Sequence, residues 1–200
     1  MKKILSFAVA TLIFLFGAYV IARQSLEEEM EIYEKTLRLH VPANSNSAED
    51  QAVKLKVRDA IINYLEEPLS TCRTKDEAVQ KVQLLSKEIT KEANKVLKEN
   101  GMDYTARVSV VQESYPTRDY EGISLPAGEY TSLKIELGKA QGQNWWCVLF
   151  PQVCVGSAKP TEALSEVGFT PNQIKLLTEH DDYKYVVKFK FLEIIEGIFG

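Results

Sequence analysis

The stretch TLRLHVPANSNS, residues 36–47, indicates how the folded part of this chain begins. Its apolar residues alternate with Arg38 and His40, a period of two that predicts a strand with one buried face. The turn-forming residues 42–47 end that strand. Ser47 stands three residues before Asp50, a variant of the capping box. The stretch therefore predicts a strand, a turn and the start of a helix.

Two helical patterns follow this turn. The first runs from Ala48 to Glu67, where Pro68 is expected to stop it, and its apolar residues at helical spacing are Val53, Val57, Ile61 and Leu65. The second opens with a capping box formed by Thr74 and Glu77. It ends at Asn100-Gly101, because glycine suits the left-handed conformation of a helix C-cap.

The period changes to two beyond the second helix. This change predicts strands over residues 104–110, 130–137 and 144–150, the last nearly all apolar and expected to lie centrally in a sheet. Pro171 is expected to open a short helix, and residues 185–191 read as a last strand. We therefore predict a single α+β domain over 36–200: two layers, with a mostly antiparallel sheet and helices packed on one face.

The N-terminal segment has the pattern of an export signal. Lys2 and Lys3 precede residues 4–21, which carry no charge, and small residues at 20 and 22 suit cleavage before Arg23. The run is also long enough for a membrane anchor. We expect residues 1–22 to be a hydrophobic export helix that acts as a signal peptide or an anchor, and residues 23–35 to be an acidic linker or helix.

Composition excludes some classes of function. The formal net charge is −4 and no basic patch is evident, which argues against a nucleic-acid partner. Neither histidine has a second histidine four residues away, and no cysteine or aspartate stands at ligand spacing. We therefore predict no metal site and no cofactor.

Two cysteines, Cys147 and Cys154, lie seven residues apart with Pro151 between them. In an exported protein, a disulfide closing this loop is the plain interpretation. The alternatives are a nucleophilic cysteine with His40 or His180 as its base, or free buried thiols. Cys72 has no evident partner in the sequence.

Adjacent tryptophans form a further candidate feature. Trp145 and Trp146 follow one another on a predicted strand, so their side chains should face opposite sides of the sheet. An exposed tryptophan is a common anchor of protein interfaces. Burial of both indoles between layers is the alternative.

Two stretches resemble signatures of the stage II sporulation protein R family. The first is residues 37–47 with Asp50-Gln51, Lys54 and 57–60, and the second comprises residues 115–117, 125–130, 137–138 and 144–151 with Cys154. The run NWWCVLFP at 144–151 is the most specific part. Asn46 stands where the family pattern has aspartate, which removes a charge but keeps the turn. The resemblance covers roughly residues 1 to 155.

The resemblance implies an activating ligand and not an enzyme. Members of this family are made in the forespore and secreted across its membrane into the space between the two septal membranes. There they activate a membrane-embedded aspartic protease, which removes the pro-sequence from the precursor of mother-cell sigma factor E. The implied partners are this protease, the export machinery and signal peptidase. Contact with a membrane surface, or anchoring by residues 4–21, remains an alternative.

The contact surface expected for such a signal combines the polar turn with its neighbours. Its candidate residues are His40, Asn44, Asn46, Arg58, Asp59, Trp145 and Trp146. The competing hypothesis is an exported cysteine-dependent hydrolase or wall-modifying enzyme that uses Cys147 or Cys154 with His40.

Overall fold

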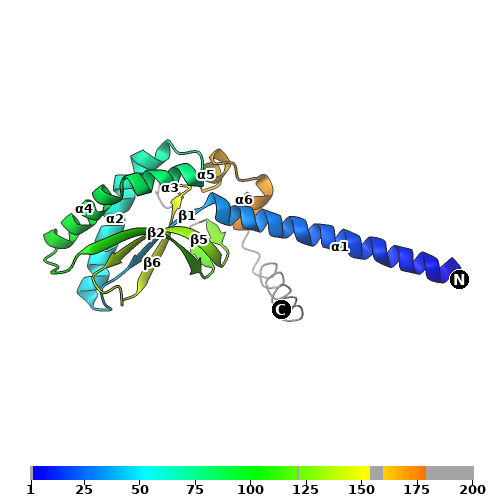
Figure 1. Ribbon diagram of the computed structural model, residues 1–200, viewed down its shortest axis with the longest axis horizontal. Helices are drawn as coiled ribbons and strands as arrows, with labels where there is room; N and C mark the ends of the chain where they lie inside the picture. Colours follow the sequence, from blue (N-terminus) through cyan, green and yellow to red (C-terminus); the bar gives the residue numbers. More distant parts are fainter. Residues whose placement is uncertain (1, 121, 154–159, 179–200) are drawn as a thin grey trace.

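The computed structural model describes residues 2–120, 122–153 and 160–178 (Figure 1). The helices are α1 (Lys2–Lys35), α2 (Ala48–Ser70), α3 (Lys75–Leu84), α4 (Ser86–Glu99), α5 (Pro160–Glu166) and α6 (Pro171–Thr178). The strands are β1 (Leu37–Pro42), β2 (Ala106–Tyr115), β3 (Arg118–Tyr120), β4 (Ile123–Leu125), β5 (Gly128–Leu137) and β6 (Asn144–Phe150). The strand predicted at 185–191 lies outside the described residues.

The main sheet has four strands in the order β2-β5-β1-β6. β1 pairs in parallel with β5, whereas the β1–β6 and β2–β5 pairs are antiparallel. The α+β class with a mostly antiparallel sheet is thus confirmed. The central position expected for β6 is not found, because β6 ends the order of the described strands. It is apolar because both of its faces are covered: Cys147 and Leu149 join one core, and Val148 joins another.

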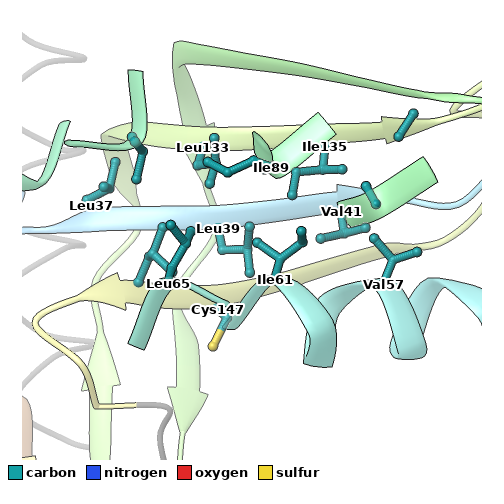
Figure 2. Packing of buried hydrophobic residues seen from close by; sticks show 14 of the residues in the cluster. Leu37, Leu39, Val41, Val57, Ile61, Leu65, Ile89, Leu133, Ile135 and Cys147 are labelled. Carbon is teal, nitrogen blue, oxygen red and sulfur yellow. The ribbon is translucent and has the colours of Figure 1, made fainter. Parts of the chain in front are cut away.

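The first core lies between α2, α3 and α4 and one face of the main sheet, which we call the helix face. Figure 2 shows how its side chains meet: Leu37, Leu39 and Val41 of β1 project toward Ile61 and Leu65 of α2. All five are fully shielded from solvent. The alternation of residues 37–41 therefore positions β1 as predicted, since every second residue enters this core.

Two helix boundaries differ from the predictions. α2 continues through Pro68 to Ser70, so this proline removes one helical hydrogen bond without ending the helix. The second predicted helix is interrupted at Leu85, which divides it into α3 and α4. Its predicted ends are confirmed: the Glu77 N–H donates to Thr74 Oγ1 at 3.3 Å, and Gly101 has a φ of 75°.

A second core forms on the opposite side of the sheet, which we call the second face. It joins the last turn of α1, the β3–β4 hairpin, α5 and α6, through Ile32, Ile123, Leu125, Val148, Leu164, Phe169 and Leu177. Helices therefore lie on both sides of the sheet, and the prediction of helices on one face holds only for α2, α3 and α4. The correction follows from Val148, a sheet residue that packs away from α2.

α1 is one continuous helix that projects away from the folded domain (Figure 1). Its last turns contact the domain, where Tyr33 Oη donates to the Ala127 carbonyl at 3.0 Å and the Tyr33 ring meets that of Tyr130 edge-on at 4.9 Å. Among the described residues, no helix combines the length and hydropathy that a membrane crossing requires. The division at residues 22 and 35 stays a prediction.

Candidate functional site

The turn after β1 is locked to the loop before β6. The Asn44 side-chain carbonyl accepts from the Lys139 N–H at 2.9 Å, and that of Asn46 accepts from the Gln143 N–H at 2.8 Å. The buried Lys54 ammonium of α2 donates to the Gln143 carbonyl at 3.1 Å. The side-chain oxygens of both predicted contact asparagines therefore hold the turn after β1 against the loop before β6.

Asp50 is the centre of this lock. Its carboxylate accepts from Asn44 Nδ2 at 2.9 Å, from Ser45 Oγ at 2.5 Å and from Tyr104 Oη at 2.5 Å. Burial of Asp50 opposes ionisation, but these hydrogen bonds outweigh it and hold the pKa of the carboxyl below its usual value. Its own N–H donates to Ser47 Oγ, which caps α2 as predicted.

Two glycines allow the locked segments to approach. A Cβ at Gly142 would lie 2.1 Å from the Ser45 carbonyl oxygen, and one at Gly138 would lie 2.3 Å from Asn44 Oδ1. Gly138 also has a φ of 56°, a left-handed conformation that suits glycine. The turn and the loop therefore fit together only because both positions lack a side chain.

Arg58, Asp59 and Trp145 lie together on the helix face. The Arg58 guanidinium stacks 4.2 Å from the Trp145 ring centroid and pairs with Asp59 at 2.6 Å. The Asp59 side chain is 58% exposed, whereas the Trp145 ring packs against the first core and its buried Nε1 has no hydrogen-bond partner. In this part of the predicted patch, the Asp59 carboxylate is exposed and the Trp145 indole mostly packs against the first core.

His40 and Trp146 lie on the opposite side of the sheet. The two residues pair across β1 and β6, and their ring centroids are 5.8 Å apart. The predicted contact residues are therefore not one patch, because the sheet separates His40 and Trp146 from Trp145 and Arg58. The expectation that the adjacent tryptophans face opposite sides is confirmed.

Arg38 is the centre of the second face. It is fully buried, and its guanidinium lies 4.3 Å from the ring centroid of Tyr115 and 4.8 Å from that of Tyr130. Its Nε donates to the Cys147 carbonyl at 3.1 Å and its Nη2 to Tyr120 Oη at 2.5 Å. Nη1 has no hydrogen-bond partner. The aromatic rings attract the cation, but none of them neutralises its charge.

A chain of ionisable groups lies beside Arg38. Glu113 of β2 binds His40 Nδ1 through Oε1 at 2.9 Å and Lys134 Nζ through Oε2 at 3.1 Å. Burial raises the pKa of Glu113, but the attraction of His40 and the hydrogen bonds to Lys134 and His40 outweigh this effect, so the pKa is lowered overall. The other ring nitrogen of His40, Nε2, is buried and has no partner.

The rim of this region is aromatic and basic. Arg118, an exposed residue at the start of β3, lies over the half-buried ring of Trp146 at 4.2 Å from its centroid. Tyr120, two residues along the same strand, contacts Arg38. We call the whole set the second-face cluster, and its members are Arg38, His40, Glu113, Tyr115, Arg118, Tyr120, Tyr130, Lys134 and Trp146.

Comparison with known proteins places both signatures within one family match. The family model described as Stage II sporulation protein R matches residues 33–159. This chain belongs to the stage II sporulation protein R family. Stage II sporulation protein R of Bacillus subtilis (strain 168) is 31% identical to it over 172 residues, which cover 83% of this chain and 77% of that protein. No solved structure matches.

The region matched by the stage II sporulation protein R family begins at Tyr33, within the last turns of α1 that contact the domain. It includes the locked turn and loop, and the whole second-face cluster. Membership of this family gives the chain a role in sporulation.

Cys147 does not form a catalytic pair with His40 in the described structure. Cys147 projects to the helix face and is buried there, whereas His40 projects to the second face. Cys154 lies outside the described residues, so the predicted disulfide with Cys147 stays a prediction. Cys72 is free and lines a cavity of about 170 Å³, and burial raises the pKa of its thiol. The described residues include no group of three or more potential metal ligands.

Sequence reasoning missed most of the second-face cluster. Alternation predicts that Arg38 and His40 lie on the unburied face of β1, whereas the structure buries both. One available signal was that the first family signature contains Arg38, while the second contains Tyr115, Tyr130 and Trp146. The contacts themselves join residues 73 to 82 positions apart, as in His40–Glu113 and Arg38–Tyr120. A hydrophobic period within a short segment cannot predict contacts over such separations.

Proposed function

We propose that this protein is a secreted intercellular signal of sporulation that activates a membrane-embedded aspartic protease, and so leads to processing of the precursor of mother-cell sigma factor E. The observation that carries the proposal is the family match over residues 33–159, which contains the folded domain up to the end of β6. The role in sporulation follows from family membership. Activation of the protease and processing of the sigma factor precursor are the parts that we propose.

Export of the domain is the second part of the proposal. Its support is the sequence of residues 1–22, with two lysines ahead of an uncharged apolar run. In this proposal the chain crosses the forespore membrane into the intermembrane space, where residues 4–21 are either removed or retained as an anchor. The folded domain then meets the protease on the far side of the membrane.

Activation by surface contact suits the construction of the domain. The polar turn and its loop are held by internal hydrogen bonds, so the domain presents a preformed surface that needs little ordering on binding. Among the predicted contact residues, Asp59 is exposed and Trp146 is half-buried beside an exposed arginine. We propose these two as contacts, one on each side of the sheet.

The cysteine-dependent hydrolase gains no support from the placement of Cys147 and His40 on opposite faces of the sheet. We therefore retain the signalling proposal alone.

Deleting the gene tests this function directly. Sporulation should stop just after the asymmetric septum forms, with the sigma factor precursor uncut, and the intact gene supplied in the forespore should restore cleavage. A matched variant lacking residues 1–22 should accumulate in the forespore without restoring cleavage. Normal cleavage of the precursor in the deletion strain would contradict the proposed function.

A further inference from the structure

The charges of the second-face cluster do not balance. Among the described residues, Lys134 pairs with Glu113 at 3.1 Å, and Arg107 of β2 pairs with Glu136 of β5 at 3.6 Å. No ion pair of the described part of the chain includes Arg38 or Arg118. Two guanidinium groups therefore remain without a carboxylate on a protein whose net charge is −4.

The short strand β3 links the two unpaired cations: it carries Arg118, and its Tyr120 contacts Arg38 of β1. Arg118 and Tyr120 are two residues apart on β3 and so project to the same side. Tyr120 accepts a hydrogen bond from buried Arg38, and Arg118 covers Trp146, which neighbours His40. The positive charge of Arg38 thus lies behind the exposed charge of Arg118, in a low-dielectric interior that screens it weakly.

A buried charge without a counter-ion is unfavourable, and a neighbouring anion relieves this cost. In the folded chain, Arg38 Nη1 and His40 Nε2 are both buried and both lack a hydrogen-bond partner. His40 and Arg38 are each at least nine-tenths shielded from solvent. The second-face cluster therefore lacks a counter-ion for its arginines and hydrogen-bond partners for two buried nitrogens.

We infer that the second-face cluster receives an acidic side chain of the protein partner, whose carboxylate pairs with Arg118 beside Trp146. The inference rests on the proposed function, since it gives the chemistry of the partner's contact. Arg118 makes the direct ion pair and Trp146 supplies the apolar surface around it. Arg38 acts through the electrostatic potential that it adds at this point.

The chemistry favours one carboxylate over an anionic membrane. Binding to a lipid surface needs several exposed cations that act together. Among the described cations of this face, Arg107, Lys134 and Lys35 already have glutamate partners. Arg118 is the free exposed cation of the described second face, and a single guanidinium beside an indole is typical of the centre of a protein interface.

The experiment uses the purified full chain and two short probes. N-acetyl hexaglutamate amide and its glutamine counterpart are titrated while the indole N–H resonance of Trp146 is followed by NMR. The glutamate peptide should shift this resonance and the glutamine peptide should not. Arg118→Ala should weaken the interaction by about tenfold, because it removes the pairing charge.

Two matched variants sharpen the result. Arg107→Ala removes an exposed arginine of the same face that is already paired, so affinity should change by less than about twofold. Arg38→Met keeps a long buried side chain but removes the charge, and it should weaken binding by a few-fold without removing it. Thermal unfolding of each variant shows whether the fold is retained.

Three outcomes would overturn the inference. They are equal binding of both peptides, equal loss in Arg118→Ala and Arg107→Ala, or binding of phosphatidylglycerol vesicles through Arg118 without binding of the glutamate peptide. The last result would assign the site to a membrane. The titration does not depend on sigma factor processing, so a failed deletion experiment with a positive titration would refute the function and leave the acid-binding site.

Discussion

The two faces of β1 differ in the chemistry of their surroundings, although successive residues of this six-residue strand alternate between them. Leu37, Leu39 and Val41 enter an apolar core under α2, where nothing but packing is required. Arg38 and His40 enter a region of charges and aromatic rings that is equally buried. One face therefore stabilises the fold by removing apolar surface from water, whereas the other holds polar groups that burial alone does not favour.

The comparison teaches that burial does not distinguish a core from a site. Leu39 and Arg38 are both fully shielded, yet only Arg38 keeps an unsatisfied donor. Proteins rarely leave such a group without a reason, so an incomplete hydrogen-bond set is the better guide to a surface that awaits a partner.

The helix face should be the more sensitive to loss of volume. Leu39→Ala should lower the free energy of unfolding by about 2–5 kcal/mol, because it leaves a cavity between β1 and α2. Urea denaturation measures this loss. Arg38→Met on the adjacent second-face position is the control and should change it by less, since the new side chain fills a similar volume. A larger loss in Arg38→Met would reverse the comparison.

The locked turn should depend on the charge of one aspartate. Asp50→Asn should lower the free energy of unfolding by about 1.5–3 kcal/mol at neutral pH, because hydrogen bonds from Asn44, Ser45 and Tyr104 lose their ionised acceptor. Chemical denaturation measures the loss, and Asp59→Asn is the exposed control. Equal small effects of both changes would show that the turn does not need the carboxylate.

Glu113 of the second face should stabilise the fold by an amount that decreases in acid. The pKa of Glu113 is lowered from 4.5 in the folded chain, so its ionised form stabilises the fold above the unfolded pKa, and this contribution is lost as the pH falls through the folded pKa. Glu113→Gln should cost about 1 kcal/mol at neutral pH. The difference from the wild type should shrink in acid, as thermal unfolding across this range can show. A difference that stays constant with pH would contradict this assignment.

Matched arginine–indole pairs give the smallest effects. Arg58→Ala on the helix face should lower stability by about 0.5–1 kcal/mol, because its guanidinium covers Trp145 and is mostly shielded from water. Arg118→Ala on the second face should lower it by less, since Arg118 is exposed. The binding titration should respond in the opposite order. A larger stability loss for Arg118→Ala would show that this pair is structural.

Much of the fold follows from local patterns in the sequence. The period of residues 37–41 predicts β1, and the capping residues Ser47 and Thr74 predict where α2 and α3 begin. Pro171 opens α6 as expected. These predictions succeed because capping, turns and alternation depend on residues only a few positions apart.

The candidate site was less predictable. His40 and Trp146 were identified, and the structure places them side by side. Glu113, Lys134 and Arg118 were not identified, because their roles arise from pairing between β2, β5 and β1 and from the position of β3. Asn44 and Asn46 stay predicted contacts, and the sequence does not show that their side-chain oxygens also accept hydrogen bonds from the loop before β6.

The family, the α+β class and the helix and strand periods follow from residues that are neighbours in the chain. The position of β1 between β5 and β6, the helices on both sides of the sheet and the burial of Arg38 without a counter-ion became visible with the folded structure. The physical reason is distance along the chain. The environment of a side chain depends on residues that folding brings together from distant parts of the chain. Alternation alone does not show whether the polar face of a strand contacts water or another layer of the fold.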